Sequence, residues 1–392
     1  MKEIYLDNAA TTAVRPEVAE AMLPYFTSVY GNPSSLHGIG QKGKEALERA
    51  RADVASSLNV EPREIYFTSG GTESNNLAIK GYAAAAMAKG RHLVTSPLEH
   101  HAALYVFQQL EKQGFEVTYL PVDRSGLVDP ADFERAIRED TILVSVMLAN
   151  NEIGTIEPVR EIAALARERG IAVHTDAVQA VGKIPVDLQD LGVDMLSLTA
   201  HKFYGPKGVG VLYKRDQLEI RPLFEGGSQE RVLRPGTENI PGAVGLAKAL
   251  KLAVGELETE GPRLAGLRDR FEKGILAGLD HVTVNGHPGK RVPNLSSINF
   301  SFLEGEALLM ALDVKGIAVS TASACSAGTD DPSHVLRAIG LDPVTARSTL
   351  RFSLGRNNTA GEIDYAVETV VHTVKLLRSY SPVRAAGQGA GA

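Results

Sequence analysis

Short apolar runs alternate with stretches of helical periodicity between residues 64 and 213. The apolar runs predict strands at 64–68, 92–95, 117–120, 141–148, 170–174, 194–198 and 209–213. Apolar residues at helical spacing predict intervening helices at 74–89, 102–113, 130–139 and 159–169. Continuous apolar strands separated by helices are typical of a mostly parallel sheet covered on both faces. The pattern therefore predicts an α/β domain built on a mostly parallel seven-stranded sheet.

The order of elements changes after Thr259-Glu-Gly261. Beyond this point we expect strands at 281–284, 297–300, 317–320 and 350–353 among helices at 262–279, 305–315 and 360–377. The N-terminal part predicts a strand at 4–6 and helices at 16–25 and 39–58, and a further helix at 243–257 leads into the second lobe. A chain of 392 residues exceeds the size at which one core keeps growing. We expect a large domain at 13–258, a small α+β domain made of 1–12 and 259–384, and a disordered tail at 385–392.

Polar side chains follow several of the predicted strands at their carboxyl ends. They are Thr72, Glu99-His100-His101, Asn150-Asn151-Glu152, Asp176 with Gln179, and His201-Lys202. In open parallel sheets, ligands bind beyond this edge. One or two such residues would be routine turn chemistry, but five strand ends with polar groups indicate a shared site.

Lys202 lies in the turn between the last two predicted strands, where short backbone anchors it. A lysine held in this way suits imine chemistry, as in enzymes that bind pyridoxal 5'-phosphate (PLP) through a Schiff base. An ordinary surface lysine in a hairpin is the alternative. The turn Gly70-Gly71-Thr72 before a helix could hold a phosphate, although such turns are also routine connections.

Other residues at the same edge fit the remaining parts of that cofactor. Asp176 would pair with a protonated pyridine nitrogen, or would only cap a helix that we expect to start near Ala177. Gln179 could donate to the phenolate oxygen of the ring, and His100 could stack on the ring and move protons. A metal held by Glu99-His100-His101 is the weaker interpretation, because three adjacent side chains do not face one ion.

Composition narrows the possible partners. The formal net charge is −6 and no basic stripe is present, which makes nucleic acid and anionic membranes poor candidates. No apolar run approaches the roughly 18 residues of a membrane span, and the start lacks the apolar core of a signal peptide, so a cytoplasmic location is expected. The single cysteine, Cys325, rules out an internal disulfide and a multi-cysteine zinc site within one chain. A lone thiol of this kind is more often an incidental core residue than a nucleophile.

Five motifs together closely resemble those of cysteine desulfurases, which belong to the class V aminotransferase group of fold-type-I PLP enzymes. They are Thr68-Ser-Gly-Gly-Thr-Glu-Ser-Asn-Asn76, Asn150-Asn-Glu-Ile-Gly154, Asp176-Ala-Val-Gln179, Ala200-His-Lys-Phe-Tyr-Gly-Pro206 and Ser323-Ala-Cys-Ser-Ala-Gly328. The resemblance runs from Tyr5 to Arg356, nearly the whole chain. No single motif is specific, but the combination is.

The resemblance implies a role for each matching residue around PLP. Lys202 becomes the Schiff-base lysine, His100 the ring-stacking residue, Asp176 the partner of the pyridine nitrogen and Gln179 the partner of the phenolate. The phosphate cup falls on Gly71, Thr72, Thr199 and His201, and Asn151 is also placed at the cofactor. Thr237 matches a threonine that completes this cup from the other subunit, which implies a homodimer.

The same resemblance implies that the substrate is L-cysteine. Asn151 and Arg351 match the grip on its carboxylate, with Asn32 assisting, and Cys325 matches the nucleophile that becomes a persulfide. The products would be L-alanine and sulfur, passed to an iron–sulfur scaffold or another acceptor protein. No metal is implied, apart from an iron–sulfur cluster that Cys325 could hold transiently. His100 is the candidate that takes the thiol proton.

The chain departs from the family pattern in a few places. Thr321-Ala322 replaces the usual Ser-Gly before the cysteine motif, and Thr199 stands where serine is common. The longer cysteine segment, extending to Pro332-Ser-His-Val-Leu-Arg337, resembles the group that serves iron–sulfur assembly. Three alternatives remain open: a selenocysteine lyase, another class V aminotransferase, and a non-catalytic sulfur-carrier scaffold.

Overall fold

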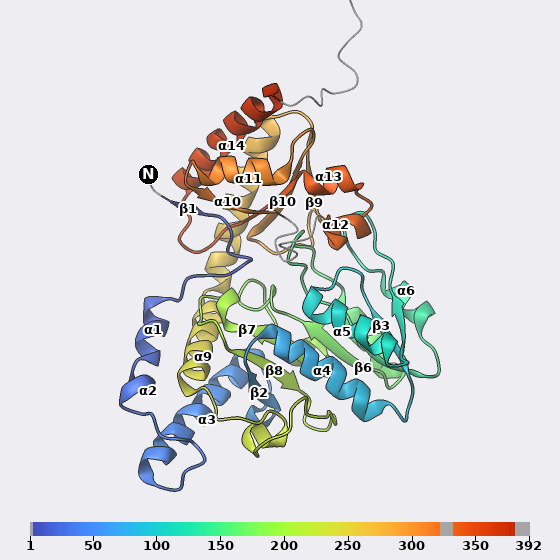
Figure 1. Ribbon diagram of the computed structural model, residues 1–392, viewed down its shortest axis with the longest axis vertical. Coiled ribbons are helices and arrows are strands. Elements are labelled where there is room, and N and C mark those ends of the chain that lie inside the picture. Colours follow the sequence, from blue (N-terminus) through green and yellow to red (C-terminus); the bar gives the residue numbers. More distant parts are fainter. Residues whose placement is uncertain (1–2, 322–331, 381–392) are drawn as a thin grey trace, which may run out of the picture.

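The computed structural model describes residues 3–321 and 332–380. Cys325 and the predicted tail at 385–392 lie outside this part of the chain. The described residues form two layered regions, which occupy the lower and upper halves of Figure 1.

The lower region is built on a seven-stranded sheet with strand order β2-β8-β7-β6-β5-β3-β4. Its strands are β2 (Ile65–Thr68), β3 (His92–Thr95), β4 (Glu116–Tyr119), β5 (Thr141–Ser145), β6 (Ala172–Asp176), β7 (Met195–Thr199) and β8 (Gly210–Lys214). Only β8 runs against its neighbours β2 and β7, and the other pairings are parallel. The predicted α/β class with a mostly parallel sheet of seven strands is therefore confirmed.

Helices cover both faces of this sheet, and six of its seven strands are therefore buried at every position. On one face lie α4 (Gly71–Ala86) and α5 (His101–Lys112), which share one apolar cluster. The other face carries α3 (Gly38–Leu58), α6 (Pro130–Ala136), α7 (Val159–Glu168), α8 (Leu188–Leu191) and α9 (Ile240–Gly255). Two short helices, α1 (Pro16–Met22) and α2 (Pro24–Thr27), pack against α9.

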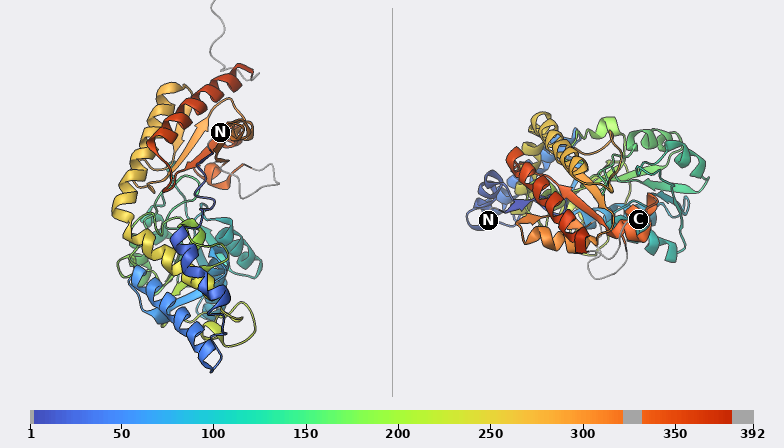
Figure 2. Two further views of the ribbon diagram at one scale, coloured as in Figure 1. Left: turned by 90° about the vertical axis from the view of Figure 1, so that its left-hand side faces the viewer. Right: turned by 90° about the horizontal axis from the view of Figure 1, so that it is seen from above.

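The upper region contains an antiparallel sheet in the order β12-β13-β10-β9. Its strands are β9 (Val282–Asn285), β10 (Leu295–Phe300), β12 (Ser320–Thr321) and β13 (Thr349–Ser353). The helices are α10 (Leu257–Gly278), α11 (Gly305–Asp313), α12 (His334–Ala338), α13 (Pro343–Arg347) and α14 (Ala360–Tyr380), with α10 and α14 packed side by side (Figure 2). The strand β1 (Ile4–Tyr5) pairs in parallel with β11 (Ile317–Ala318), so the first described residues belong to this smaller α+β region together with α14.

Several predicted boundaries were wrong for identifiable reasons. The helix expected at 16–25 is divided, because Pro24 starts a new helix. The strand expected at 317–320 is split between two sheets as β11 and β12. The helix expected from 262 begins at Leu257, so Thr259-Glu-Gly261, where we expected the boundary between the two domains, lies inside α10. The division into 13–258 and 259–384 stays a prediction.

A buried ion pair fixes one irregular segment against the large sheet. Arg51 on α3 donates from Nη2 and Nη1 to the two carboxylate oxygens of Glu230, at 2.7 and 2.8 Å. Glu230 lies in the turn η3 (Gln229–Val232), and it also accepts from the backbone N–H of Phe67 at 2.9 Å. Three successive residues of η3 from Glu230 have positive φ angles, an unfavourable conformation that these contacts hold in place.

We predict that Glu230→Gln lowers the free energy of unfolding by about 3–5 kcal/mol, because it leaves the Arg51 guanidinium buried without a counter-charge. Chemical denaturation of wild type and variant measures this difference. Asp216→Asn is the matched control, since Asp216 pairs with Arg63 on the surface and should cost less than about 1 kcal/mol. Equal losses in the two variants would contradict the role of the buried pair.

Candidate active site

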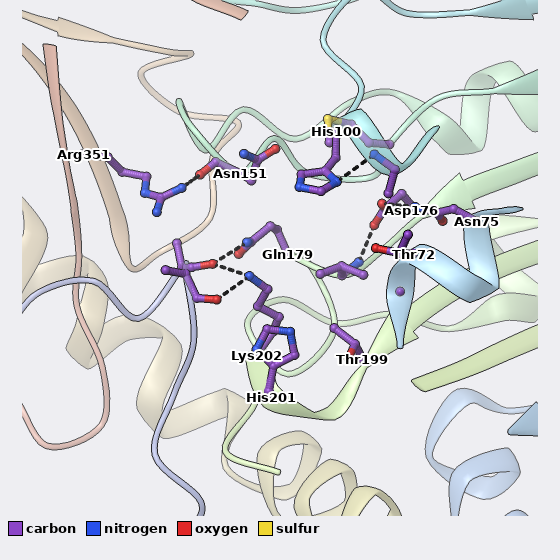
Figure 3. Close-up of a pocket in the computed structure, with 16 residues that line it drawn as sticks. Thr72, Asn75, His100, Asn151, Asp176, Gln179, Thr199, His201, Lys202 and Arg351 are labelled. Atoms are coloured by element: carbon purple, nitrogen blue, oxygen red, sulfur yellow. Dashed lines mark hydrogen bonds between the residues drawn. The ribbon is translucent and has the colours of Figure 1, made fainter. Parts of the chain in front are cut away.

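The predicted site residues meet in one cavity of about 330 Å³ above the carboxyl edge of the large sheet. Those that line it are Gly71, Thr72, His100, Asn151, Asp176, Gln179, Thr199, His201, Lys202 and Arg351 (Figure 3). Arg351 comes from β13 of the smaller region, and all the others come from the larger one. The cavity therefore lies where the two regions meet.

Three of the predicted residues are not placed in this cavity. Thr237 and Asn32 are both exposed and do not line it. The Oδ1 atom of Asn32 instead accepts a hydrogen bond from the backbone N–H of Ser34 at 2.9 Å. The resemblance assigns Thr237 to the cavity of a second subunit, which a single chain does not test. Cys325 lies outside the described residues, so its role also stays a prediction.

Lys202 occupies a single helical turn, η2 (Ala200–Lys202), directly after β7. Its Nζ atom donates to the carbonyl oxygens of Ala9 and Ala10, both at 2.7 Å. The N-terminal segment is fastened to the same turn, because the N–H of Thr12 donates to the carbonyl of His201 at 2.9 Å. Lys202 is half-buried and faces the cavity, which argues against an ordinary surface lysine in a hairpin.

Asp176 ends β6 and is 4% exposed. Its Oδ1 accepts from the backbone N–H of Val178 at 2.9 Å, and its Oδ2 accepts from Nδ2 of Asn75 at 2.6 Å. Asp176 thus caps a turn, where the sequence predicted a helix starting near Ala177, and it also lines the cavity. Its pairing with a pyridine nitrogen stays a prediction. Asn75, which was not predicted as a site residue, also lines the cavity and lies within the motif 68–76 that carried the resemblance.

The start of α4 forms another part of the cavity wall, next to Asp176. This helix begins at Gly71, three residues before the predicted start, which places Gly71 and Thr72 in its first turn. A Cβ atom added to Gly71 would lie 2.8 Å from Cγ2 of Val178, so only glycine fits here without a shift. The first turn of a helix presents unpaired backbone N–H groups and a positive dipole end. Together with the Thr199 side chain, this end suits a phosphate.

Arg351 and Asn151 form the wall that faces the smaller region. Arg351 is 4% exposed; it donates from Nη1 to the Asn151 carbonyl at 2.8 Å and from Nη2 to Oδ1 of Asp7 at 3.0 Å. In the described part of the chain, Nε of Arg351 and Oδ1 of Asn151 are buried with no hydrogen-bond partner. Unsatisfied buried polar atoms are costly, so they indicate a ligand with complementary polar groups.

The histidines of the cavity are held neutral. Burial lowers the pKa of His100, and burial followed by the charge of Lys202 lowers the pKa of His201 to about 4. The backbone N–H of Ala102 donates to Nδ1 of His100 at 3.1 Å. The proton of the neutral His100 ring therefore lies on Nε2.

The adjacent His101 does not line this cavity. Its ring stacks on Tyr105 and lies against His334 of α12, with both centroid distances 4.7 Å. Within residues 3–321 and 332–380, no group of three or more His, Cys, Asp or Glu side chains is arranged to hold a metal ion. No helix in the same ranges is long and apolar enough to cross a lipid bilayer.

The family model for class-V aminotransferases matches residues 4–366. This chain belongs to the class-V aminotransferase family. A protein from Methanosarcina thermophila named cysteine desulfurase IscS is 52% identical over 382 residues, which cover 97% of this chain and 94% of that protein. A protein of the same name from Dictyoglomus turgidum is 50% identical over 383 residues, covering 98% of this chain and 97% of its own. These relatives confirm the resemblance to cysteine desulfurases that the motifs indicated.

Solved structures support the same conclusion. A structure titled NIFS-like protein superimposes with a TM-score of 0.90 at 40% identity, and covers 95% of this chain and 100% of its own. Another, titled SspA in complex with cysteine, has a TM-score of 0.80 at 39% identity and covers 90% of this chain and 98% of its own. The overall fold is therefore shared with these proteins.

His174 lies beneath the cavity, two residues before Asp176 on the same strand. Its Nδ1 and Nε2 atoms bond to the hydroxyls of Ser145 and Ser197 at 2.8 and 3.0 Å, and burial lowers its pKa to about 3. The unfolded chain therefore binds a proton on this residue below its ordinary pKa of about 6.5, whereas the folded chain does not until pH falls to about 3. Proton binding to the unfolded chain therefore lowers the free energy of unfolding as pH falls from about 6.5 to about 3.

We predict that His174→Gln weakens the loss of stability on acidification, by up to about 1.4 kcal/mol per pH unit. The free energy of unfolding, measured for wild type and variant at several pH values between 4 and 6.5, tests this difference in slope. Measurements at pH 8 provide the baseline for any packing effect, because both proteins are neutral at position 174 there. Parallel curves below pH 6 would refute the prediction.

Proposed function

We propose that this chain is a PLP-dependent cysteine desulfurase that converts L-cysteine to L-alanine and passes the sulfur to Cys325 as a persulfide. The observation that carries the proposal is the meeting of Lys202, Asp176, Gln179 and Arg351 in one cavity. The relatives named cysteine desulfurase, at about half identity over nearly the full length, support the same reaction.

The residues present fit PLP at both ends. Asp176 would hold the pyridine nitrogen, and the first turn of α4 with Thr72, Thr199 and His201 would hold the phosphate. A side chain at Gly71 would collide with Val178, so glycine lets the first turn of α4 pack closely at this end of the cavity. Bound PLP supplies an electron sink that stabilises negative charge developing on the substrate carbon next to the amine.

Arg351 and Asn151 would bind the carboxylate of the substrate. Nε of Arg351 is a buried donor without a partner among the described residues, so it could donate to the substrate carboxylate together with the side-chain NH₂ of Asn151. Asp7 and the Asn151 carbonyl hold the guanidinium in place from the other side. The chain thereby fixes one end of the substrate and turns its side chain toward the rest of the cavity.

Two groups of this chain would handle protons. Lys202 Nζ, anchored on the Ala9 and Ala10 carbonyls, would take the proton from the substrate carbon α. His100 would hydrogen-bond to sulfur through its Nε2–H. We expect His100 to accept the thiol proton. Because Nδ1 already accepts a hydrogen bond from the backbone N–H of Ala102, His100 must first lose the hydrogen on Nε2.

The further destination of the sulfur is part of the same proposal. An iron–sulfur scaffold or another thiolation protein would take it from Cys325, in the cytoplasm, and the enzyme would act as a homodimer. Support for the dimer comes from the exposed position of Thr237, which leaves it available to another copy of the chain. The name IscS, carried by the relatives, favours iron–sulfur assembly.

A selenocysteine lyase and a transaminase remain the enzymatic alternatives. The ratio of kcat/KM for L-selenocysteine and L-cysteine separates the first. A transaminase would instead convert an amino acid and a 2-oxo acid in paired half-reactions, without any need for Cys325. The neighbour titled as a complex with cysteine favours L-cysteine as the substrate over both. A non-catalytic sulfur carrier would bind no PLP.

We predict that Cys325→Ala retains the visible absorbance of bound PLP but loses alanine production, because the substrate sulfur has no acceptor. The purified protein is incubated with PLP, L-cysteine and a thiol reductant, and alanine and sulfide are quantified. Cys325→Ser is the matched variant, since it restores a polar side chain of similar size without a sulfur nucleophile. Turnover at the wild-type rate in either variant would remove the persulfide step from the proposal.

A further inference from the structure

Lys183 lies behind the cavity, four residues after Gln179 in consecutive turns that follow β6. Its Nζ atom donates to Oε1 of Gln179. The other end of the same amide, Nε2, donates to the carbonyl oxygen of Ala9 at 2.9 Å. Gln179 is 4% exposed and lines the cavity, whereas Lys183 does not.

These contacts determine which end of the Gln179 amide meets a ligand. A glutamine amide has one accepting end and one donating end of nearly the same shape, so its orientation depends on its neighbours. An ammonium group can only donate, so it requires the amide oxygen and leaves the NH₂ for the other side. The Ala9 carbonyl selects the same orientation, because it accepts from Nε2 of Gln179. This carbonyl also accepts from Lys202, the amine that the proposed reaction uses. Lys183 is thus the orienting contact that does not depend on a reacting group.

The charge of Lys183 is the second observation. Burial, followed by the charges of Lys202 and Arg351, lowers the pKa of Lys183 to about 7. In the small cavity that Lys183 lines, Glu256 is paired with Arg15. A buried cation bound to a neutral amide is costly for folding alone. The position of Lys183 behind Gln179 instead favours the binding of anionic groups in the cavity that Gln179 lines.

We propose that Lys183 is a positioning residue that orients the Gln179 amide so that its NH₂ group donates to the phenolate oxygen of PLP. This inference rests on the proposed cofactor. Lys183 does not itself reach the cofactor; it acts through its hydrogen bond to Gln179.

The experiment is a double-mutant cycle on the PLP-loaded protein, with Lys183→Met, Gln179→Leu and the combined variant. Two quantities are measured at fixed pH: the dissociation constant of PLP, and the ratio of visible to near-ultraviolet absorbance of the bound cofactor. We expect Lys183→Met to weaken PLP binding about tenfold and to change the absorbance ratio. In the Gln179→Leu background, the same substitution should change the dissociation constant less than about twofold.

Controls separate this role from a structural one. Lys251→Met removes an exposed lysine on α9 and should leave both quantities unchanged. If Lys183→Met does not fold, Lys183→Gln enters the same cycle, since it keeps a donor without the charge. Unchanged affinity and spectrum, or an equal loss with and without Gln179, would overturn the inference. Failure of the wild-type protein to bind PLP would instead overturn the proposed function.

Discussion

The Lys202 side chain depends on an N-terminal segment that is remote in sequence. Its ammonium donates to the carbonyls of Ala9 and Ala10, and the same segment bonds to the turn that carries the lysine through Thr12. These carbonyls have no partner in a regular sheet or helix here, so they provide a fixed acceptor pair at the floor of the cavity. The amine is held in a defined position before any ligand arrives, which is the preorganisation that catalysis requires.

The same segment connects the two regions of the chain. Residues 4 and 5 pair with β11 in the smaller region, whereas Ala9 packs in the main apolar cluster of the larger one. Arg351 reaches the cavity from β13, and its guanidinium bonds to Asp7 of this segment. The lysine side and the carboxylate-binding side of the site are thus tied to one short stretch of backbone. A shift between the two regions would change the distance between these groups.

The sheet and most of the cavity could be predicted from the sequence, because both rest on local patterns. Apolar runs identified the strands, and the carboxyl ends of those strands placed Asp176 and Lys202 near each other. The early start of α4 was not predicted, because Gly70-Gly71-Thr72 has the composition of a turn. In the structure Gly71 begins the helix, and its lack of a Cβ allows it to pack closely on Val178.

Contacts between distant residues could not be predicted in this way. The Ala9 carbonyl meets Gln179 across 170 residues of sequence, and Asn75 meets Asp176 across 101. Periodicity carries no information about such pairs. Lys183 was missed for a different reason: its spacing from Gln179 is local, but a lysine in a turn has the composition of an ordinary surface site until its neighbours are known.

The most direct test of the account is to locate the covalent attachment of PLP. The wild-type protein is loaded with PLP, reduced with borohydride and digested, and the modified peptide is identified by mass spectrometry. The account predicts the modification on Lys202 alone, since this amine faces the cavity from a fixed position. Modification of Lys183 instead, or an unmodified chain, would contradict it.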